Sequence, residues 1–300
     1  MAIANYPSGF RGGALIKNIP FFDMIDGNVF WVDSGSGAAG NPGTFNSPLS
    51  TIAGALAKCT AANNDYVLCK AGHAETLTAA LSVTVSGVSI IGLGRGMLRP
   101  TITGNGTIDA ITISAANVTV GNMIFPAPET DAQTADINIA AAGVTVYDTY
   151  HIGSQTSKNK VDVITMTSAA DDVLLDGVRV YNSVVECVGC FAIEGALSRG
   201  EIRNCFVFDS IGWTNGALYD GATALALYVH NNVFKNAKAA TVVLEFGNNS
   251  TGICSFNHIS GRHTTLASNV TAGTGMDFFE NRVTEEAALN GAVIPAADTD

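Results

Sequence analysis

The feature that most constrains this 300-residue chain is an internal repeat of about 27 residues. Each copy follows the pattern apolar-x-apolar-x-x-Z-x-apolar, where Z is a position expected to stack on its equivalents. Repeats of about 20–50 residues are typical of solenoids, propellers and arrays, so this one sets the frame for the fold. The second apolar position of the pattern falls at Ile90, Val120, Val146, Leu175, Ile202, Val229, Cys254 and Phe278.

Alternation within each copy predicts β-strands that wind into a coil. Apolar residues two positions apart lie on the same face of a strand, so they can share one interior while the intervening residues face outward. A single copy closes no core alone, but stacked copies form a continuous one. Copies of about 25 residues fit a three-sided coil, and the usual handedness of parallel crossovers makes it right-handed. The sequence therefore predicts an all-β chain folded as a right-handed parallel β-helix.

Position Z of the last three copies carries Asn232, Asn257 and Asn281. Asparagines at equivalent turns can hydrogen-bond to the copies on either side, so we predict a structural amide ladder. The main structural alternative is a β-sandwich or jelly roll, which also alternates strands with turn residues. That alternative is not expected to return an asparagine to the same place in three consecutive copies, so the predicted fold is a pectate-lyase-like solenoid.

A helix is predicted at about residues 47–59. Ser47 is a favourable N-cap, and Leu49, Ile52 and Leu56 share one helical face. The open end of a β-helix exposes unpaired backbone and an apolar interior, which must be covered. We therefore expect this helix to cap the first turn of the coil.

The chain divides into an N-terminal arm at 1–28, the β-helix at 29–284 and a C-terminal tail at 285–300. The arm combines aromatic and basic residues with prolines and glycines that discourage regular structure. It is expected either to dock onto a partner or to fold back along its own β-helix. The candidate binding residues in the arm are Tyr6, Phe10, Arg11, Lys17, Phe21 and Phe22.

Acidic residues outnumber basic ones by 26 to 15, giving a formal net charge of −11, and charged residues make up only 14% of the chain. Nucleic acids and anionic membranes need a dense basic face, so neither is expected as a partner. The chain starts without the basic and apolar regions of a signal peptide. Its long uncharged stretches alternate or contain glycine, which is typical of strands rather than membrane-spanning helices. A soluble chain without a cofactor is predicted.

Six cysteines lie at positions 59, 69, 187, 190, 205 and 254. Cys187 and Cys190 form a lone Cys-x-x-Cys pair, without the second pair or the histidines of a zinc site. A redox dithiol would place this pair at a helix start beside a βαβ unit. We therefore expect no metal site, and reduced thiols that pack as small apolar groups in a protein made in a cytoplasm.

The candidate catalytic carboxylates are poorly placed. Glycoside hydrolysis needs two of them about 5–10 Å apart on one face, but Asp171 and Asp172 are adjacent, so they would point to opposite faces. Asp148 and Asp176 lie in neighbouring copies, one place out of register. The signatures of β-helix lyases and polygalacturonases are missing beyond the bare Asp-Asp, since residues 72–75 read Gly-His-Ala-Glu rather than Gly-His-Gly. We therefore expect no catalytic residues and a chain that is not an enzyme.

Residues 6–77 hold a series of short motifs in a fixed order. They read Tyr-Pro-Ser-Gly-Phe from residue 6, Gly-Asn-Val-Phe-Trp-Val-Asp-Ser from 27, Phe-Asn-Ser-Pro from 45, Asp-Tyr-Val-Leu from 65 and Gly-His-Ala-Glu-Thr from 72. This series resembles the trimeric β-helix decoration (cement) proteins of tailed-phage capsids. The resemblance implies a homotrimer on the virion surface, assembled in the host cytoplasm, whose arm lies on the shell of the major capsid protein.

The chain is accordingly expected to be a structural virion protein that decorates and stabilises a phage capsid. Many modest arm contacts, multiplied by three linked copies, would supply the affinity. The alternative is a tail fibre or tailspike-like β-helix that binds or cleaves surface polysaccharide. A free polysaccharide lyase is a third possibility, disfavoured by the missing signature residues and signal peptide.

Overall fold

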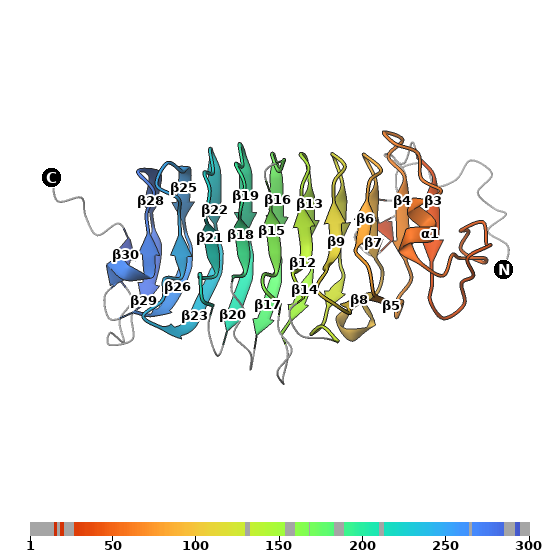
Figure 1. Cartoon of the computed structure of the whole chain (residues 1–300), viewed down its shortest axis with the longest axis horizontal. Helices are drawn as coiled ribbons and strands as arrows, with labels where there is room; N and C mark the ends of the chain where they lie inside the picture. The colour runs from red at the N-terminus through yellow and green to blue at the C-terminus, as the bar shows by residue number, and fades with distance from the viewer. Residues whose placement is uncertain are drawn as a thin grey trace.

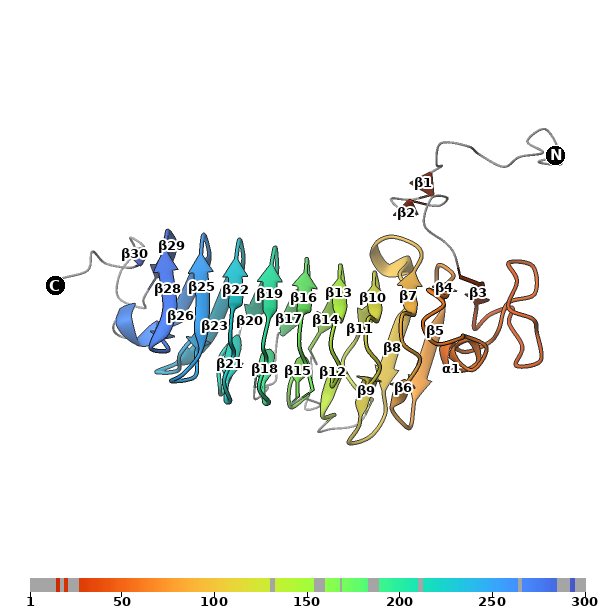
Figure 2. The same cartoon turned by 90° about the horizontal axis from the view of Figure 1, so that it is seen from above.

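The computed structural model describes residues 15–16, 19–20, 27–129, 133–153, 160–167, 169–182, 189–209, 213–263, 266–284 and 292–294. The predicted fold is confirmed, because the chain winds into a parallel β-helix whose successive turns, here called rungs, stack along one long axis (Figures 1 and 2). The strands of the rungs form three long sheets, numbered here in the order in which each rung meets them. Two short strands, β1 (Leu15–Ile16) and β2 (Ile19–Pro20), pair with each other outside these sheets.

Sheet 1 contains ten described strands. They are β3 (Val29–Val32), β4 (Tyr66–Cys69), β7 (Ser89–Gly92), β10 (Thr119–Gly121), β13 (Thr145–Tyr147), β16 (Val173–Asp176), β19 (Gly200–Arg203), β22 (Leu227–His230), β25 (Thr251–Ser255) and β28 (Gly275–Phe279).

Sheet 2 also contains ten described strands. They are β5 (Ala74–Leu77), β8 (Thr101–Gly104), β11 (Ile124–Phe125), β14 (Tyr150–Ile152), β17 (Arg179–Asn182), β20 (Phe206–Asp209), β23 (Val233–Ala239), β26 (His258–Arg262), β29 (Asn281–Thr284) and β30 (Ala292–Ile294). All of its pairings are parallel except the last, in which β30 pairs antiparallel with β29.

Sheet 3 contains eight described strands. They are β6 (Leu81–Val83), β9 (Asp109–Ile113), β12 (Ala135–Ile139), β15 (Ile164–Met166), β18 (Phe191–Ile193), β21 (Leu218–Asp220), β24 (Leu244–Glu245) and β27 (Val270–Thr271). Two single-turn 3-10 helices, η1 (Gly96–Leu98) and η2 (Leu266–Asn269), interrupt the connections between strands.

The repeat in the sequence corresponds to the strand register of sheet 1. Its eight second positions, from Ile90 to Phe278, lie directly opposite one another on neighbouring strands. The register continues two strands further toward the N-terminus, through Val67 and Phe30, which the repeat pattern did not include. Side chains at these positions belong to or pack against one continuous apolar core that fills the bore of the solenoid. This burial drives the stacking of the rungs.

A single left-handed residue turns the chain from sheet 1 into sheet 2. The position directly before Z has a positive φ on seven successive rungs, a conformation that asparagine, aspartate and glycine adopt most readily. Phe256 and Glu280 occupy it on the last two of these rungs at φ 56° and 54°, where their side chains make the conformation uncommon. The seven residues are Asn122, Asp148, Gly177, Asn204, Asn231, Phe256 and Glu280.

The asparagines at Z form a buried ladder. The Nδ2 of Asn232 donates to the Oδ1 of Asn257 at 2.9 Å, and the Nδ2 of Asn257 donates to the Oδ1 of Asn281 at 2.9 Å. Backbone N–H groups join the same chain of bonds, since that of Cys205 donates to the Oδ1 of Asn232 at 2.8 Å. The three amides are at most 1% exposed and cannot reach water. Each bond of the ladder therefore replaces a hydrogen bond to water that the amide loses on burial.

The helix that caps the first rungs is shorter than predicted. α1 spans Ile52–Leu56 rather than residues 47–59, and its N-cap is Thr51 instead of Ser47. The cause lies just upstream, where Leu49 donates its N–H to the Trp31 carbonyl and pairs with Val32 as an isolated β-bridge, which keeps the preceding backbone extended along β3. α1 still packs against β3, β4 and β6, so it covers this end of the bore as predicted (Figure 1).

Candidate functional site

Residues of the Gly-His-Ala-Glu motif hold the N-terminal end together. The His73 side chain is fully buried, and its Nδ1 accepts the N–H of Ser34 at 2.9 Å while its Nε2 lies 2.8 Å from Glu75 Oε1. The same Glu75 oxygen accepts the N–H of Ile52 at 2.6 Å, at the start of α1. The motif therefore ties the end of β3 and the capping helix to β5, which is a structural role.

Asp65 fixes the other side of this end. Its carboxylate accepts the N–H groups of Asn28 at 2.6 Å and Thr60 at 2.7 Å, and the side-chain amide of Asn63 at 2.7 Å. Burial raises the pKa of Asp65, but these hydrogen bonds outweigh it and leave the pKa below its usual value. Asp65 therefore remains ionised and joins the start of β3 to the segment that follows α1.

The N-terminal end also exposes apolar side chains. Among the described large hydrophobic residues, Met97, Leu98 and Phe45 are the most exposed, at 80%, 63% and 57%. The ammonium group of Lys70 lies 4.5 Å above the Phe45 ring, and Gly72 donates its N–H to the Leu98 carbonyl. Phe45 and Leu98 therefore both contact the turn at residues 70–72. Exposed apolar groups gathered at one end of a molecule are typical of an interaction surface. The predicted arm residues Tyr6, Phe10, Arg11, Lys17, Phe21 and Phe22 lie outside the described residues.

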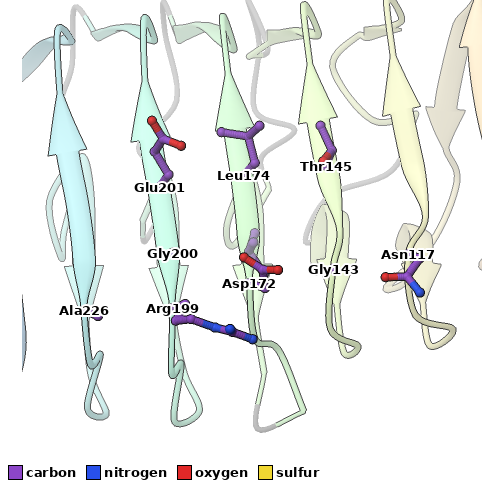
Figure 3. A pocket seen from close by; sticks show the side chains of 10 residues that line it. Asn117, Gly143, Thr145, Asp172, Leu174, Arg199, Gly200, Glu201 and Ala226 are labelled. Carbon is purple, nitrogen blue, oxygen red and sulfur yellow. The ribbon is translucent and has the colours of Figure 1, made fainter.

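An open groove of about 590 Å³ crosses the outer face of sheet 1 (Figure 3). Thr145, Leu174 and Glu201 lie side by side in register on β13, β16 and β19 and form its floor. Its edge is formed by the turns that precede these strands and their neighbours, together with the first residues of β16 and β19. The edge residues are Asn117, Gly143, Asp172, Val173, Arg199, Gly200 and Ala226.

Ion pairs fix the charged groups of this groove. Arg199 Nη2 lies 3.0 Å from Asp171 Oδ2 at its edge. Glu201 Oε1 is 3.0 Å from Arg203 Nη1 and 2.9 Å from His230 Nε2, while Arg203 Nη2 reaches Asp176 at 3.0 Å. The groove thus presents both signs of charge in fixed positions, which suits a polar or charged ligand.

Glu201 in the groove and Asp171 beside it have lowered pKa values. Burial raises the pKa of Glu201, but the hydrogen bonds from His230 and Arg203 lower it by a larger amount, so the pKa of Glu201 is below its usual value. The hydrogen bond from Arg199 lowers the pKa of Asp171. General acid–base hydrolysis needs one carboxyl that keeps its proton near neutral pH, and neither group does. This geometry supports binding more directly than proton transfer.

The other acidic residues considered in the sequence lie in or beside sheet 1. Asp172 has a left-handed backbone beside the groove, and Asp171 is held by Arg199. Asp176 lies opposite Tyr147 in the register of sheet 1, so Asp148 is one place out of register with it. The two are joined only through the backbone, since Asp148 donates its N–H to the Asp176 carbonyl at 3.0 Å.

The bore contains an ionisable network that the repeat pattern did not reveal. His151 occupies the inward position between Phe125 and Val180, where the sequence pattern breaks. Its Nδ1 lies 2.8 Å from Asp136 Oδ2, and Lys160 Nζ lies 2.5 Å from the same oxygen. All three side chains are at most 2% exposed. The adjoining cavity of about 10 Å³ is too small for an organic substrate, so this network is structural.

Asp162 is a carboxyl whose pKa is raised toward neutrality. Burial raises it, and the nearby Glu194 adds to the effect, giving a pKa of about 7. The side chain sits just before β15 and is 5% exposed. Sequence reasoning missed it, because only its buried position at the edge of sheet 3 distinguishes it from the other acids.

The cysteines that the structure describes are packed as small buried or half-buried groups. Burial raises the pKa of Cys59, Cys205 and Cys254 to about 12, so these thiols stay protonated. Cys187 lies outside the described residues. Within the described ranges no group of three or more His, Cys, Asp or Glu residues is arranged to hold a metal ion. No described helix is long and apolar enough to cross a membrane.

Stacked parallel strands, an internal Asn ladder and a lateral groove define the molecule as a parallel β-helix protein. No protein-family model matches the chain, and no curated protein does. Among solved structures it is similar to a rhamnogalacturonan lyase at 14% identity and a TM-score of 0.46, over 89% of this chain and 79% of that chain. It is similar to a pectin methylesterase mutant in complex with a hexasaccharide at 12% identity and a TM-score of 0.47, over 89% and 91%. A GH136 lacto-N-biosidase from Eubacterium ramulus matches at 11% identity and a TM-score of 0.34, over 86% and 68%.

These comparisons contradict the expectation that the chain is not an enzyme. That expectation rested on the missing signatures of two enzyme groups, yet the matched structures are a lyase, a methylesterase and a lacto-N-biosidase. A fold does not determine a chemistry, so the absence of particular motifs does not exclude catalysis. At 11–14% identity the likeness concerns the fold and assigns no activity to this chain.

Proposed function

We propose that the chain is a structural protein of a phage virion, which decorates the capsid and stabilises it by binding the shell of the major capsid protein. The observation that carries the proposal is the exposed apolar surface of the N-terminal end, formed by Phe45, Met97 and Leu98. Phe45 lies within residues 6–77, which resemble decoration proteins, and the arm precedes this end in the chain. A rod with one adhesive end suits attachment to a large flat partner.

Affinity in this proposal is distributed over several weak contacts. The arm residues Tyr6, Phe10, Arg11, Lys17, Phe21 and Phe22 would lie on the shell beside the exposed apolar surface. Association into a homotrimer would link three such ends, so that each bound end raises the effective concentration of the others. The protein would be assembled in the host cytoplasm and reside on the capsid surface.

Co-sedimentation of the full-length chain with shells of the same phage's major capsid protein tests this proposal. The double variant Met97→Ser/Leu98→Ser is expected to bind about tenfold more weakly, because both side chains lie at the proposed contact. Leu225→Ser is the matched control, since Leu225 is 47% exposed on a later rung. Shells that do not retain the wild-type chain, or equal losses in both variants, would contradict the proposal.

The second candidate function is a tail fibre or tailspike-like protein that binds or cleaves surface polysaccharide. The groove on sheet 1 favours it, because its volume of about 590 Å³ and its mixed charges suit several hydroxyl and charged groups of a glycan. Incubation with host polysaccharide, followed by measurement of chain length and of retained polymer, separates cleavage from binding. Glu201→Gln is expected to reduce both the cleavage of the polysaccharide and its retention by the protein. Unchanged chain length together with no retained polymer would eliminate this candidate.

A further inference from the structure

The outer face of sheet 2 carries aromatic side chains on three successive strands. Tyr150, Tyr181, Phe206 and Phe208 form what we call the aromatic stripe, with ring centroids 6.3 Å apart for Tyr150 and Tyr181, 5.8 Å for Tyr181 and Phe206, and 6.3 Å for Phe206 and Phe208. All four occupy outward positions of β14, β17 and β20. Phe208 is 37% exposed and the other three are half-buried. The stripe therefore places neighbouring rings on three successive strands along the solenoid axis.

Basic side chains line the same face. The guanidinium groups of Arg99 and Arg179 lie 4.1 Å and 5.6 Å from the Tyr150 ring centroid, and the Lys235 ammonium lies 4.3 Å from that of Phe208. Arg282 is exposed on β29, at the outward position that lies in register with Arg179 on β17. An aromatic ring holds a cation in place without cancelling its charge. Arg99, Arg179 and Lys235 therefore keep their charge, and all three, together with the exposed Arg282, are available to an anion.

The charges of this face are unbalanced within the described chain. None of the ion pairs among the described residues involves Arg99, Arg179, Lys235 or Arg282. The outward positions from β14 to β29 whose side chains are described carry no carboxylate, and Asp148, at the adjoining turn, is the acid that acts on Arg179. A chain with a net charge of −11 thus keeps one face with unpaired positive charge. Such a local departure from the overall charge is typical of recognition of an anionic ligand.

The cations follow the spacing of the rungs. Arg179, Lys235 and Arg282 lie on β17, β23 and β29, and one strand of sheet 2 separates each from the next. Arg262, exposed on the intervening β26, donates its Nη1 to the Ala237 carbonyl at 3.3 Å. Neighbouring strands lie about 4.8 Å apart, so these cations recur about every 10 Å along the axis. Two linked sugar rings span a comparable length. The rings of the stripe offer apolar faces on which the C–H faces of sugars can pack.

We infer that the outer face of sheet 2 binds an extended acidic glycan that carries one carboxylate for every two sugar units. The glycan lies along the solenoid axis, with its carboxylates at Arg179, Lys235 and Arg282 and its sugar rings on the aromatic stripe. A nucleic acid fits less well, because its phosphates are far denser than these cations and the protein's net charge repels it. The site is on a different face from the groove of sheet 1 and the N-terminal end, so it depends on neither function proposed above.

Titration of the full-length chain with hyaluronan oligosaccharides tests this inference, because hyaluronan alternates a carboxylated sugar with an uncharged one. The wild-type chain is expected to bind hyaluronan at least about tenfold more tightly than neutral cello-oligosaccharides of equal length, and to lose affinity as salt rises. The double variant Arg179→Gln/Lys235→Gln is expected to bind hyaluronan at least about tenfold more weakly. Polygalacturonate, with a carboxylate on every sugar, is expected to bind more weakly than hyaluronan.

A matched control separates this site from general electrostatics. Lys58→Gln/Arg95→Gln removes the same charge from exposed positions outside both the stripe and the groove and is expected to keep hyaluronan affinity within about twofold. Phe208→Ser, at an exposed ring, tests the stacking contact, and unchanged circular dichroism establishes that each variant is folded. The inference is overturned if hyaluronan binds no more tightly than the neutral glycan, if both double variants lose affinity equally, or if single-stranded poly(dT) binds more tightly than hyaluronan.

Discussion

Two stretches of the bore satisfy buried polar groups by different chemistry. Between β12 and β15 the interior holds an ionisable network in which His151 and Lys160 both contact the same oxygen of Asp136. In the last rungs it holds the neutral ladder of Asn232, Asn257 and Asn281. Members of the network compensate one another's charge, so removing one leaves the others buried without their partner. Ladder amides repeat one bond per rung, so a loss there affects only adjacent rungs.

The largest effect is expected from Lys160→Met, which removes the cation beside Asp136. The substitution leaves a buried carboxylate without its ammonium partner, and breaking such pairs costs about 3–5 kcal/mol. Urea denaturation of the folded chain measures the change in the free energy of unfolding. Lys58→Met, at an exposed position, is the control and should change it by less than about 0.5 kcal/mol. A loss below about 1 kcal/mol for Lys160→Met would contradict the expectation that the network is the more sensitive of the two stretches.

Asn257→Ala tests the middle of the ladder. It removes the acceptor of Asn232 Nδ2 and the donors to Asn281 Oδ1 and the Val229 carbonyl, so an expected loss of about 3 kcal/mol reflects unsatisfied groups on both sides. Asn281→Ala, at the last rung of the ladder, interrupts the bonds on one side and should cost less. The same urea denaturation measures both. Equal losses for the two variants would contradict a ladder that acts rung by rung.

The difference between the two stretches also explains what the sequence could predict. The ladder was visible because its three asparagines recur at one position of the repeat. The network was not, because Asp136 and Lys160 lie outside the repeat pattern, and His151 showed only as a break in it. Their contact depends on how the longer connections fold into the bore, which spacing alone does not determine.

Long-range pairs on the outer surface were partly predictable. Arg199 and Asp171 are 28 residues apart, and Arg203 and Asp176 are 27 apart, so each pair spans about one repeat and meets on neighbouring rungs. The aromatic stripe follows from the same register once strand positions are known. The boundary of the capping helix was not predictable from local propensity, because Leu49 pairs with β3 and tertiary contacts override the favourable cap at Ser47.

The pH dependence of stability is the third test, and it concerns only the ionisable network. Burial lowers the pKa of His151, so the folded state holds this ring neutral. Because the folded pKa is depressed, its contribution is present above the unfolded pKa of about 6.5 and is lost as pH falls below it. At pH 5 the expected loss relative to pH 8 is up to about 2 kcal/mol. Urea denaturation at both pH values, compared with His151→Val, isolates this contribution, and identical pH slopes in the two proteins would refute it.

The smallest effect is expected at the capping helix, which lies outside both stretches. Thr51→Ala removes the hydroxyl that accepts the Gly54 N–H at 3.1 Å, and loss of an N-cap typically costs about 1 kcal/mol. Water can reach Thr51 and replace part of the bond, unlike in the bore. Thr51→Ser keeps the acceptor and should unfold at the same urea concentration as the wild-type chain. If Thr51→Ala instead matched the loss of Asn257→Ala, the end of the solenoid would be as sensitive as its interior, and the contrast between buried and accessible polar groups would fail.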